Sequence, residues 1–148
     1  MNEEMQYVVF SLGNEEYAVE ILSVQEIIRP TEITRVPKAP PFVTGVSNLR
    51  GSIIPIIDSH QRLSLSESMQ KADTNRIIIC KIEDTPIGLT VDHVSEVLSL
   101  PADNIEIPQV MNHLDKHFIK GIGKVDERLL IILDLKNVLD IGLNIQKE

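Results

Sequence analysis

The sequence predicts an all-β fold in which two small five-stranded barrels, related by an internal duplication, pack together and carry a few short helices. Short apolar runs rich in Ile and Val recur along the chain, each bounded by polar or turn residues. The segment 45–58, "GVSNLRGSIIPIID", also returns at 121–134 as "GIGKVDERLLIILD", with a glycine, an apolar run and a final Asp at the same spacing. A length of 148 residues fits one ordinary domain or two very small ones.

The duplication covers an ordered series of blocks in both halves. Within the quoted segment the aligned positions lie 76 residues apart: Gly45 with Gly121, Ile53 with Leu129 and Asp58 with Asp134. Upstream of it they lie 70 residues apart: Val24 with Val94 and Glu26 with Glu96. We expect a single domain over 1–148, with repeats at about 7–63 and 76–140 and the polar stretch 64–75 as a linker or surface loop. A repeat of ~60 residues buries little apolar area, so the two must pack together, and strand exchange between them is plausible.

The first strands of each repeat follow from β-branched runs and the turns after them. "QYVVFSL" and "RIIICKI" are predicted strands, and the turns "NEE" and "EDTP" lead into "YAVE" and "IGLTV". In "VQEIIRP", Val24, Glu26 and Ile28 share one face of a further strand. Gln25 and Ile27 lie on its other face.

The last strand of each repeat ends on an Asp. The run "SIIPIID" is continuously apolar, which predicts burial on both faces, and Pro55 within it indicates an edge or a bulge. After Asp134 the apolar residues adopt helical spacing, which predicts a brief helix with this Asp as its N-cap.

Composition excludes several classes of function. A formal charge of −8 argues against binding to the phosphate backbone of a nucleic acid, which needs a basic surface. Aromatic residues, at 3%, are too few to stack on the bases of single-stranded nucleic acid. Cys80, the only cysteine, lies in an apolar run and is expected to be an inert core thiol in a reducing compartment. The acidic N-terminus does not resemble a signal peptide, and no apolar run approaches ~18 residues. We expect a cytoplasmic protein that neither binds nucleic acid nor inserts into a membrane.

The sequence predicts no enzyme, cofactor or metal site. Asp58 and Asp134 could in principle form an acid–base dyad, but the glycines that follow the Asp in retropepsin-type turns are missing. His113 and His117 have metal-like spacing, yet "HLDKH" lacks the Glu of the usual zinc motif. "GIG" at 121–123 is only half of a dinucleotide fingerprint.

"VQEIIRP" followed by "ITRVPKAPPFVTGVSNLRGSIIPIID" resembles the signature of the CheW family of bacterial chemotaxis coupling proteins. The similarity runs from Tyr7 to about Leu139 and includes "VDHVSEVLSL" in the second half. It implies barrels of the OB or Src-homology type. It also implies a scaffold that links chemoreceptor tips to the regulatory domain of the histidine kinase CheA within receptor arrays.

The resemblance also implies which residues bind partners. These candidates are Val24, Glu26, Asn48, Arg50 and Gly51, with Ile28 and Val94 added by a receptor-binding groove between the barrels. Arg50 aligns with Asp126 in the second repeat, and this asymmetry favours a role beyond repeat architecture. Its alternative role is to close its own turn onto a backbone carbonyl.

A second reading assigns the chain to another two-component pathway, such as surface motility, as an interaction module of the same fold. The residues leave open which receptor it serves, and which candidates face the receptor or the kinase.

Overall fold

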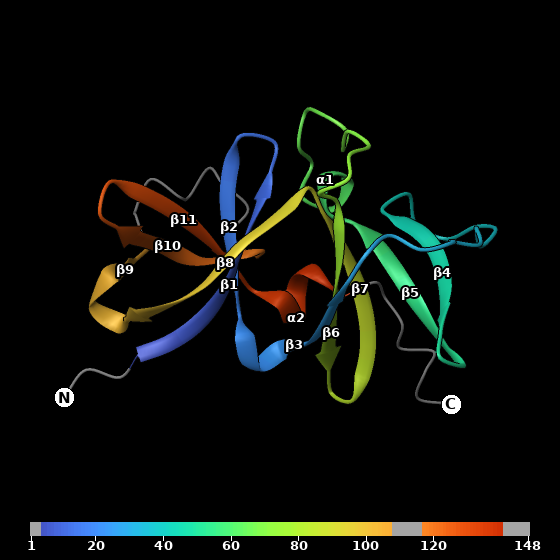
Figure 1. Ribbon diagram of the computed structural model, residues 1–148, viewed down its shortest axis with the longest axis horizontal. Helices are drawn as coiled ribbons and strands as arrows, with labels where there is room; N and C mark the ends of the chain where they lie inside the picture. Colours follow the sequence, from blue (N-terminus) through green and yellow to red (C-terminus); the bar gives the residue numbers. More distant parts are fainter. Residues whose placement is uncertain (1–3, 108–116, 141–148) are drawn as a thin grey trace.

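The computed structural model describes residues 4–107 and 117–140 (Figure 1). Its strands are β1 (Glu4–Leu12), β2 (Glu15–Glu20), β3 (Val24–Ile28), β4 (Val43–Leu49), β5 (Ser52–Asp58), β6 (Arg76–Ile82), β7 (Thr85–Val91), β8 (His93–Pro101), β9 (Ile105–Glu106), β10 (Ile119–Val125) and β11 (Arg128–Leu133). The short helices are η1 (Ile21–Ser23), α1 (Ser59–Arg62), η2 (Ala102–Asn104) and α2 (Leu135–Val138). The predicted all-β class with short helices is confirmed.

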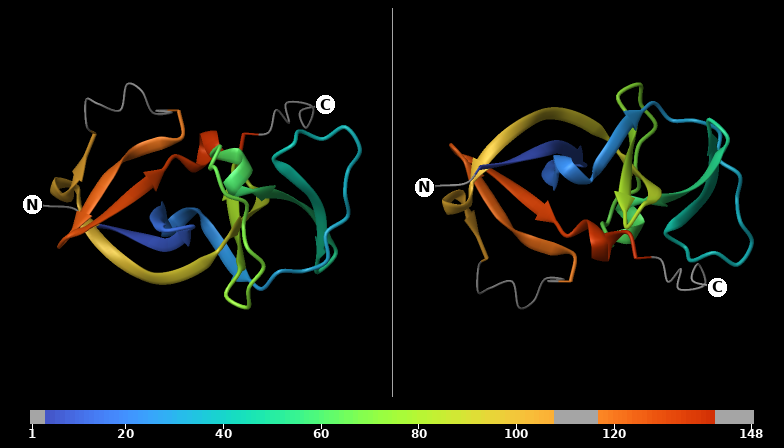
Figure 2. Two further views of the ribbon diagram at one scale, coloured as in Figure 1. Left: turned by 90° about the horizontal axis from the view of Figure 1, so that it is seen from above. Right: turned by 90° about the horizontal axis from the view of Figure 1, so that it is seen from below.

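Two sheets form two lobes that lie side by side (Figure 2). One sheet has six strands in the order β8-β1-β2-β11-β10-β9, and the other has five in the order β3-β6-β7-β5-β4. We call the lobes the six-stranded barrel and the five-stranded barrel. The extra strand of the larger sheet is the two-residue β9, and a single bridge between Thr34 and Val46 takes its place in the smaller one.

The predicted strand exchange is present in both directions. The hairpin β1–β2 of the first half pairs with β8 and β11 of the second half, while β6–β7 of the second half pairs with β3 and β5 of the first. The aligned strands also keep the same register. Tyr7 lies opposite Leu98 in the six-stranded sheet, and the aligned Ile77 lies opposite Ile28 in the five-stranded sheet. The equal registers support the internal duplication.

Both strand-terminal aspartates cap a helix, as the sequence predicts for Asp134. The Asp58 side chain accepts hydrogen bonds from the backbone N–H groups of His60 and Gln61 at the start of α1. The Asp134 side chain accepts one from the N–H of Asn137 in α2. Each cap satisfies donors that a helix N-terminus leaves without an intrahelical partner.

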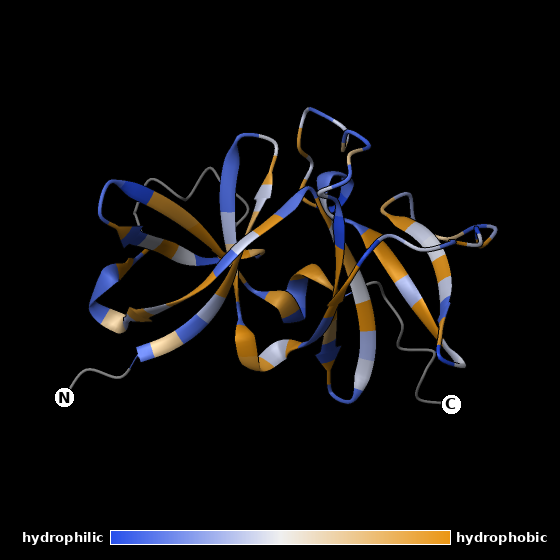
Figure 3. Ribbon diagram, in the orientation of Figure 1, coloured by the Kyte–Doolittle hydropathy of each residue, from blue (hydrophilic) through white to orange (hydrophobic). Residues whose placement is uncertain are grey.

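The largest apolar cluster spans both barrels. It combines residues of β1 and β2 with residues of β5, β6 and β7, and α2 adds Leu135 and Val138 between the lobes (Figure 3). Cys80 is fully buried in this cluster, and burial raises the pKa of its thiol to about 12, as expected for an inert core thiol. Because the cluster needs strands of both repeats, neither repeat can build it alone.

One detail of the predicted burial is wrong. Ile56 and Ile57 in β5 are buried, but Ile53 leaves 63% of its surface exposed. Only the end of β5, from Ile56 to Asp58, pairs with β7, so the start of the strand extends beyond the covered part of the sheet. Its aligned residue Leu129 is exposed to a similar extent, 61%.

Arg62 at the end of α1 joins the two repeats. Its Nε donates a hydrogen bond to the carbonyl oxygen of Val138 at 2.7 Å, and its Nη2 donates to the carbonyl oxygens of Asn137 and Asp140. The first two carbonyls lie in the last turn of α2 and the third follows the helix, and a cation is favourable at this end. The guanidinium also lies over the ring of Phe42, at 4.1 Å, and over that of Phe118, at 4.7 Å. One side chain of the first repeat thus caps the helix of the second.

We expect Arg62→Met to lower the free energy of unfolding by about 2 kcal/mol, because the carbonyls at the end of α2 lose a charged donor. Arg62→Lys should recover only part of the loss, since an ammonium lacks the planar fork that reaches several carbonyls. Denaturant unfolding measures both. The control is Lys136→Met on the exposed side of α2, which should change stability by no more than about 0.5 kcal/mol. Equal losses at Arg62 and Lys136 would contradict this role.

Cleavage between Asp73 and Thr74 separates the chain into its two repeats. Each fragment alone is expected to be unfolded or aggregated, because each lacks at least two strands of both sheets. An equimolar mixture should regain the native amide spectrum, since residues 64–75 contain no helix or strand and the cut removes no strand pairing. A well-dispersed spectrum from either fragment alone would show that a repeat is self-sufficient.

Candidate functional site

The turn between β4 and β5 carries three of the candidate residues. Arg50 and Gly51 form the turn with φ angles of 52° and 90°, and the side chain of Asn48 accepts a hydrogen bond from the N–H of Gly51 at 2.9 Å. A positive φ is strained for any residue but glycine. Arg50 adopts it nonetheless, so the turn fixes the direction in which its side chain leaves the backbone.

Arg50 forms an ion pair with Glu26 of β3. Its Nη2 donates to Glu26 Oε2, and the Arg50 side chain remains 66% exposed. Because β3 and β4 are the two outer strands of the five-stranded sheet, this pair links opposite edges of the barrel. The sequence did not predict the contact between Arg50 and Glu26. It left open whether Arg50 binds another protein or closes its own turn onto a backbone carbonyl. At this level of exposure the pair contributes no more than about 1 kcal/mol to stability.

The apolar candidates lie at different depths. Val24, on the same strand as Glu26, and Val94, near the start of β8, are both half-buried against the largest apolar cluster. Ile28 packs instead against a smaller cluster inside the five-stranded barrel. Among the candidates, the structure places Asn48, Arg50 and Gly51 at the β4–β5 hairpin and brings Glu26 of β3 to the same hairpin through its ion pair with Arg50. Val94 lies in the other sheet, opposite Phe10.

The six-stranded barrel has a comparable ion pair that sequence reasoning missed. Glu96 aligns with Glu26, and its carboxylate accepts a hydrogen bond from Arg128 at 2.7 Å. Arg128 also forms a two-pronged contact with Glu16, at 3.0 and 3.1 Å. Hydrogen bonds to Glu16 and Glu96 raise the pKa of its guanidinium. Arg128 stands two residues after Asp126, the position that aligns with Arg50, so a strict alignment does not reveal it.

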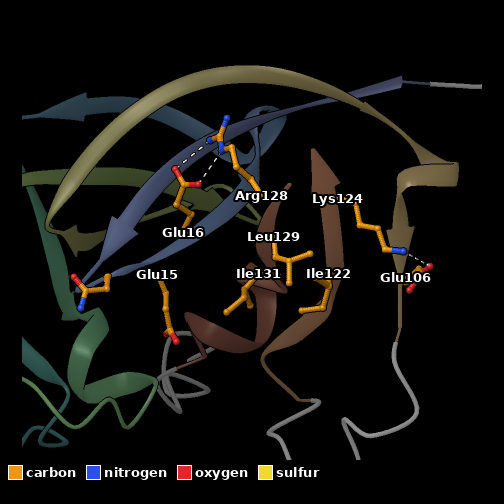
Figure 4. Close-up of a pocket in the computed structure, with 9 residues that line it drawn as sticks. Glu15, Glu16, Glu106, Ile122, Lys124, Arg128, Leu129 and Ile131 are labelled. Carbon is orange, nitrogen blue, oxygen red and sulfur yellow. Dashed lines mark hydrogen bonds and ion pairs between the residues drawn. The ribbon is translucent and has the colours of Figure 1, made fainter. Parts of the chain in front are cut away.

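A groove of about 560 Å³ lies beside Arg128 (Figure 4). Ile122, Leu129 and Ile131 of β10 and β11 form its apolar part. Two ion pairs stand at its rim, Arg128 with Glu16 and Lys124 with Glu106. An apolar strip between charged side chains is typical of a protein-binding surface rather than of a catalytic pocket.

The two aspartates that could form an acid–base dyad act as helix caps in the structure. Asp58 and Asp134 each cap a different helix. Over 4–107 and 117–140, no three His, Cys, Asp or Glu side chains gather in a way that could hold a metal ion. His113, one of the two histidines with metal-like spacing, lies outside the described residues, and His117 lies within them. In the same described ranges, no helix is long and apolar enough to cross a membrane.

Comparison with known proteins gives a consistent result. The profile of the CheW family, described as the CheW-like domain, matches residues 6–142. The chain is 39% identical to the chemotaxis protein CheW of Klebsiella aerogenes over 90% of its own length and 81% of the relative's. It is 37% identical to the chemotaxis protein CheW of Bacillus subtilis, over 90% and 85% of the two chains.

A solved structure has the same fold. It is the crystal structure of the scaffolding protein TtCheW from Thermoanaerobacter tengcongensis, which superimposes with a TM-score of 0.86. The match covers 95% of each chain at 36% sequence identity.

The positive φ of Arg50 makes a specific prediction about stability. Arg50→Gly and Arg50→Ala both remove the ion pair, but only glycine relieves the backbone strain. Glycine also gains entropy in the unfolded chain, which offsets part of that gain. We expect Arg50→Gly to exceed Arg50→Ala in free energy of unfolding by about 0.5–1 kcal/mol. At Ser52, an exposed position in β5, the order should reverse, with alanine the more stable. The same order at both positions would show that the turn is unstrained.

Proposed function

The chain belongs to the CheW-like domain family of chemotaxis scaffold proteins, and from that membership we propose that it couples chemoreceptors to the histidine kinase CheA without catalysing a reaction. In this role it binds the cytoplasmic tip of a receptor on one surface and the regulatory domain of the kinase on another. Its place in the cell would be the cytoplasmic side of membrane-associated receptor arrays.

The observation that carries the proposal is the cluster at the β4–β5 hairpin. Arg50 and Asn48 are exposed there, beside the ion-paired Glu26. One of the donors of Arg50 binds Glu26, and the exposed guanidinium can direct others to a partner carboxylate or to carbonyls at a helix end. A receptor tip is a helical hairpin, so apolar side chains beside these charges would receive its helix side chains.

The half-buried valines supply that apolar component. Val24 lies on the same strand as Glu26, but a bulge between the two residues turns their side chains to different faces, so the shared face expected from the sequence is not present. Val94 occupies the position aligned with Val24 in β8. Both side chains pack at the margin of the largest apolar cluster, so a partner that contacts them would rest on a rigid support. The charges around them would mainly set orientation and association rate. Arg50, Glu26, Asn48 and Gly51 are the residues we assign to binding, with Val24, Ile28 and Val94 as apolar contacts.

The second candidate function is that of a CheW-like module in another two-component pathway, such as surface motility. The same surface would serve it, with a different receptor and kinase. Co-precipitation from the native cell distinguishes the two, because only the chemotaxis role brings down methyl-accepting receptors together with CheA.

We expect Arg50→Ala to weaken binding to a receptor cytoplasmic fragment or to the CheA regulatory domain at least tenfold by calorimetry, because exposed arginines are frequent binding hot spots. The matched control is Lys120→Ala, which removes an exposed ion pair with Glu20 on the other barrel and should leave that affinity unchanged. The denaturant midpoint should move little in either variant.

The double variant Glu26→Arg with Arg50→Glu separates binding from turn closure. It restores an ion pair within the chain but reverses the charges presented to a partner. If Arg50 binds the partner directly, affinity stays low in the double variant. Recovery of wild-type affinity would mean that the pair only shapes its own turn, and unchanged affinity in Arg50→Ala would remove Arg50 from the binding surface.

A further inference from the structure

The arginines at the two hairpins are engaged to different extents. Arg128 of the six-stranded barrel contacts two carboxylates, those of Glu16 and Glu96. Among the described residues, Arg50 of the five-stranded barrel contacts only the carboxylate of Glu26, which aligns with Glu96. The exposed fraction of the side chain differs in the same sense, 38% for Arg128 and 66% for Arg50. Arg50 therefore lacks the second carboxylate that the arginine of the other barrel binds.

The aligned strand of the five-stranded barrel provides no second carboxylate. Glu16 of β2 lies opposite Ser11, and the aligned Pro86 of β7 lies opposite Lys81 in the same register. A proline side chain has no hydrogen-bonding group, so it cannot take the place of Glu16. Arg50 directs a donor of its Nη2 to Glu26, and its other N–H groups remain available at the surface.

Asn48 adds a second donor at the same hairpin. The backbone N–H of Gly51 can only donate, so the amide atom of Asn48 that faces it at 2.9 Å is the oxygen. The NH₂ group of this exposed amide is therefore left for another acceptor, and none of the described residues provides one. Ile53 lies opposite Asn48 in the β4–β5 pair and is 63% exposed, so an aliphatic side chain flanks the amide.

The aligned position in the other barrel shows what a donor binds there. Lys124 aligns with Asn48 and lies opposite the exposed Leu129. Its Nζ donates a hydrogen bond to the carboxylate of Glu106 at 2.7 Å. Glu106 belongs to β9, and the five-stranded barrel has the uncharged Thr34 in the corresponding bridge to its outer strand. Both donors of the second hairpin thus bind carboxylates of their own chain, whereas the first hairpin has no equivalent of either Glu16 or Glu106.

We propose that Arg50 and Asn48 together bind a carboxylate side chain of the partner, with an apolar neighbour of that side chain resting on Ile53. The inference rests on the proposed coupling function and names the group that this hairpin recognises, an Asp or Glu side chain. A carboxylate only accepts hydrogen bonds and has two oxygens, so it can engage the guanidinium and the amide at once. It would stand beside Arg50 as Glu16 stands beside Arg128, and the fold already shows that one arginine can serve two carboxylates.

Substitutions at Asn48 separate the donor from the shape of the turn. Asn48→Asp keeps an oxygen for the N–H of Gly51 but replaces the NH₂ group by a second, negatively charged oxygen. Asn48→Ala removes both groups. The binding of a receptor cytoplasmic fragment and of the CheA regulatory domain is measured by calorimetry for wild type and both variants, and denaturant midpoints show that each variant is folded.

For the partner that this hairpin contacts, we expect Asn48→Ala to bind about tenfold more weakly than wild type, because a hydrogen bond to a charged group is lost. Asn48→Asp should bind about tenfold more weakly again, because two carboxylates then face each other, and added salt should narrow that difference. The matched control is Gln61→Glu, the same exchange of an amide for a carboxylate at an exposed position of α1, beyond the far end of β5. It should leave the affinity unchanged.

The partner carboxylate can also be trapped covalently. Asn48→Lys places an amine where Lys124 stands in the other barrel, and a carbodiimide reagent couples an amine to a carboxyl group but not to a backbone carbonyl. We expect an amide bond between position 48 and an Asp or Glu of the bound partner, located by peptide mass spectrometry. Gln61→Lys should give no such product at position 61.

The outcomes distinguish this site from the proposed function. Wild type that binds neither partner would refute both. If wild type binds, equal affinities of Asn48→Asp and Asn48→Ala at low salt would refute the carboxylate site alone. Binding of Asn48→Lys without a cross-link at position 48 would do the same, and this result does not depend on the other two variants.

Discussion

Two parallel strand pairs hold this molecule together, β2 with β11 and β5 with β7. Each joins a hairpin of one repeat to a hairpin of the other, so each barrel is a product of the whole chain. Ile56 lies opposite Gly88 in one pair, and the aligned Ile132 lies opposite Ala18 in the other. The positions that face Ile56 and Ile132 both carry small residues. At Gly88 a Cβ would lie 2.6 Å from the Ile56 side chain, which shows how little space the parallel contact leaves.

The exchanged arrangement determines where charged side chains are available. The backbone groups of the central strands are hydrogen-bonded in the strand pairs, and the hairpin tips extend beyond the paired part of each sheet. Arg50 and Arg128 stand at such tips and bind the aligned carboxylates Glu26 and Glu96. The exposed Ile53 and Leu129 follow the same tips, one in each barrel. Each barrel thus presents an arginine, a carboxylate and an exposed aliphatic side chain from corresponding strands.

Local features of this fold could be predicted from the sequence, and non-local ones could not. The cap at Asp134 joins residues only three positions apart, so it is visible in the chain. The alternation expected along β3 is interrupted by a bulge between Val24 and Glu26, which depends on the pairing with β6. The exposure of Ile53 depends on where β7 stops covering β5, and the contact between Arg128 and Glu16 joins residues 112 positions apart. The resemblance to the CheW family proposed residues of the β4–β5 hairpin as candidates for partner binding. It could not show that Arg50 already has a partner in its own chain.

The segment 64–75 acquires a particular importance from the exchange. It is the connection that lets β6 return to the sheet that contains β3, after the chain has completed β5 and α1. If this segment were shortened until β6 could not reach β3 of its own chain, the hairpin β6–β7 could still find the same pairing partners in a second copy. Two such chains would assemble the same barrels from exchanged halves and form a closed dimer. The length of one polar loop therefore decides whether this architecture is monomeric or domain-swapped.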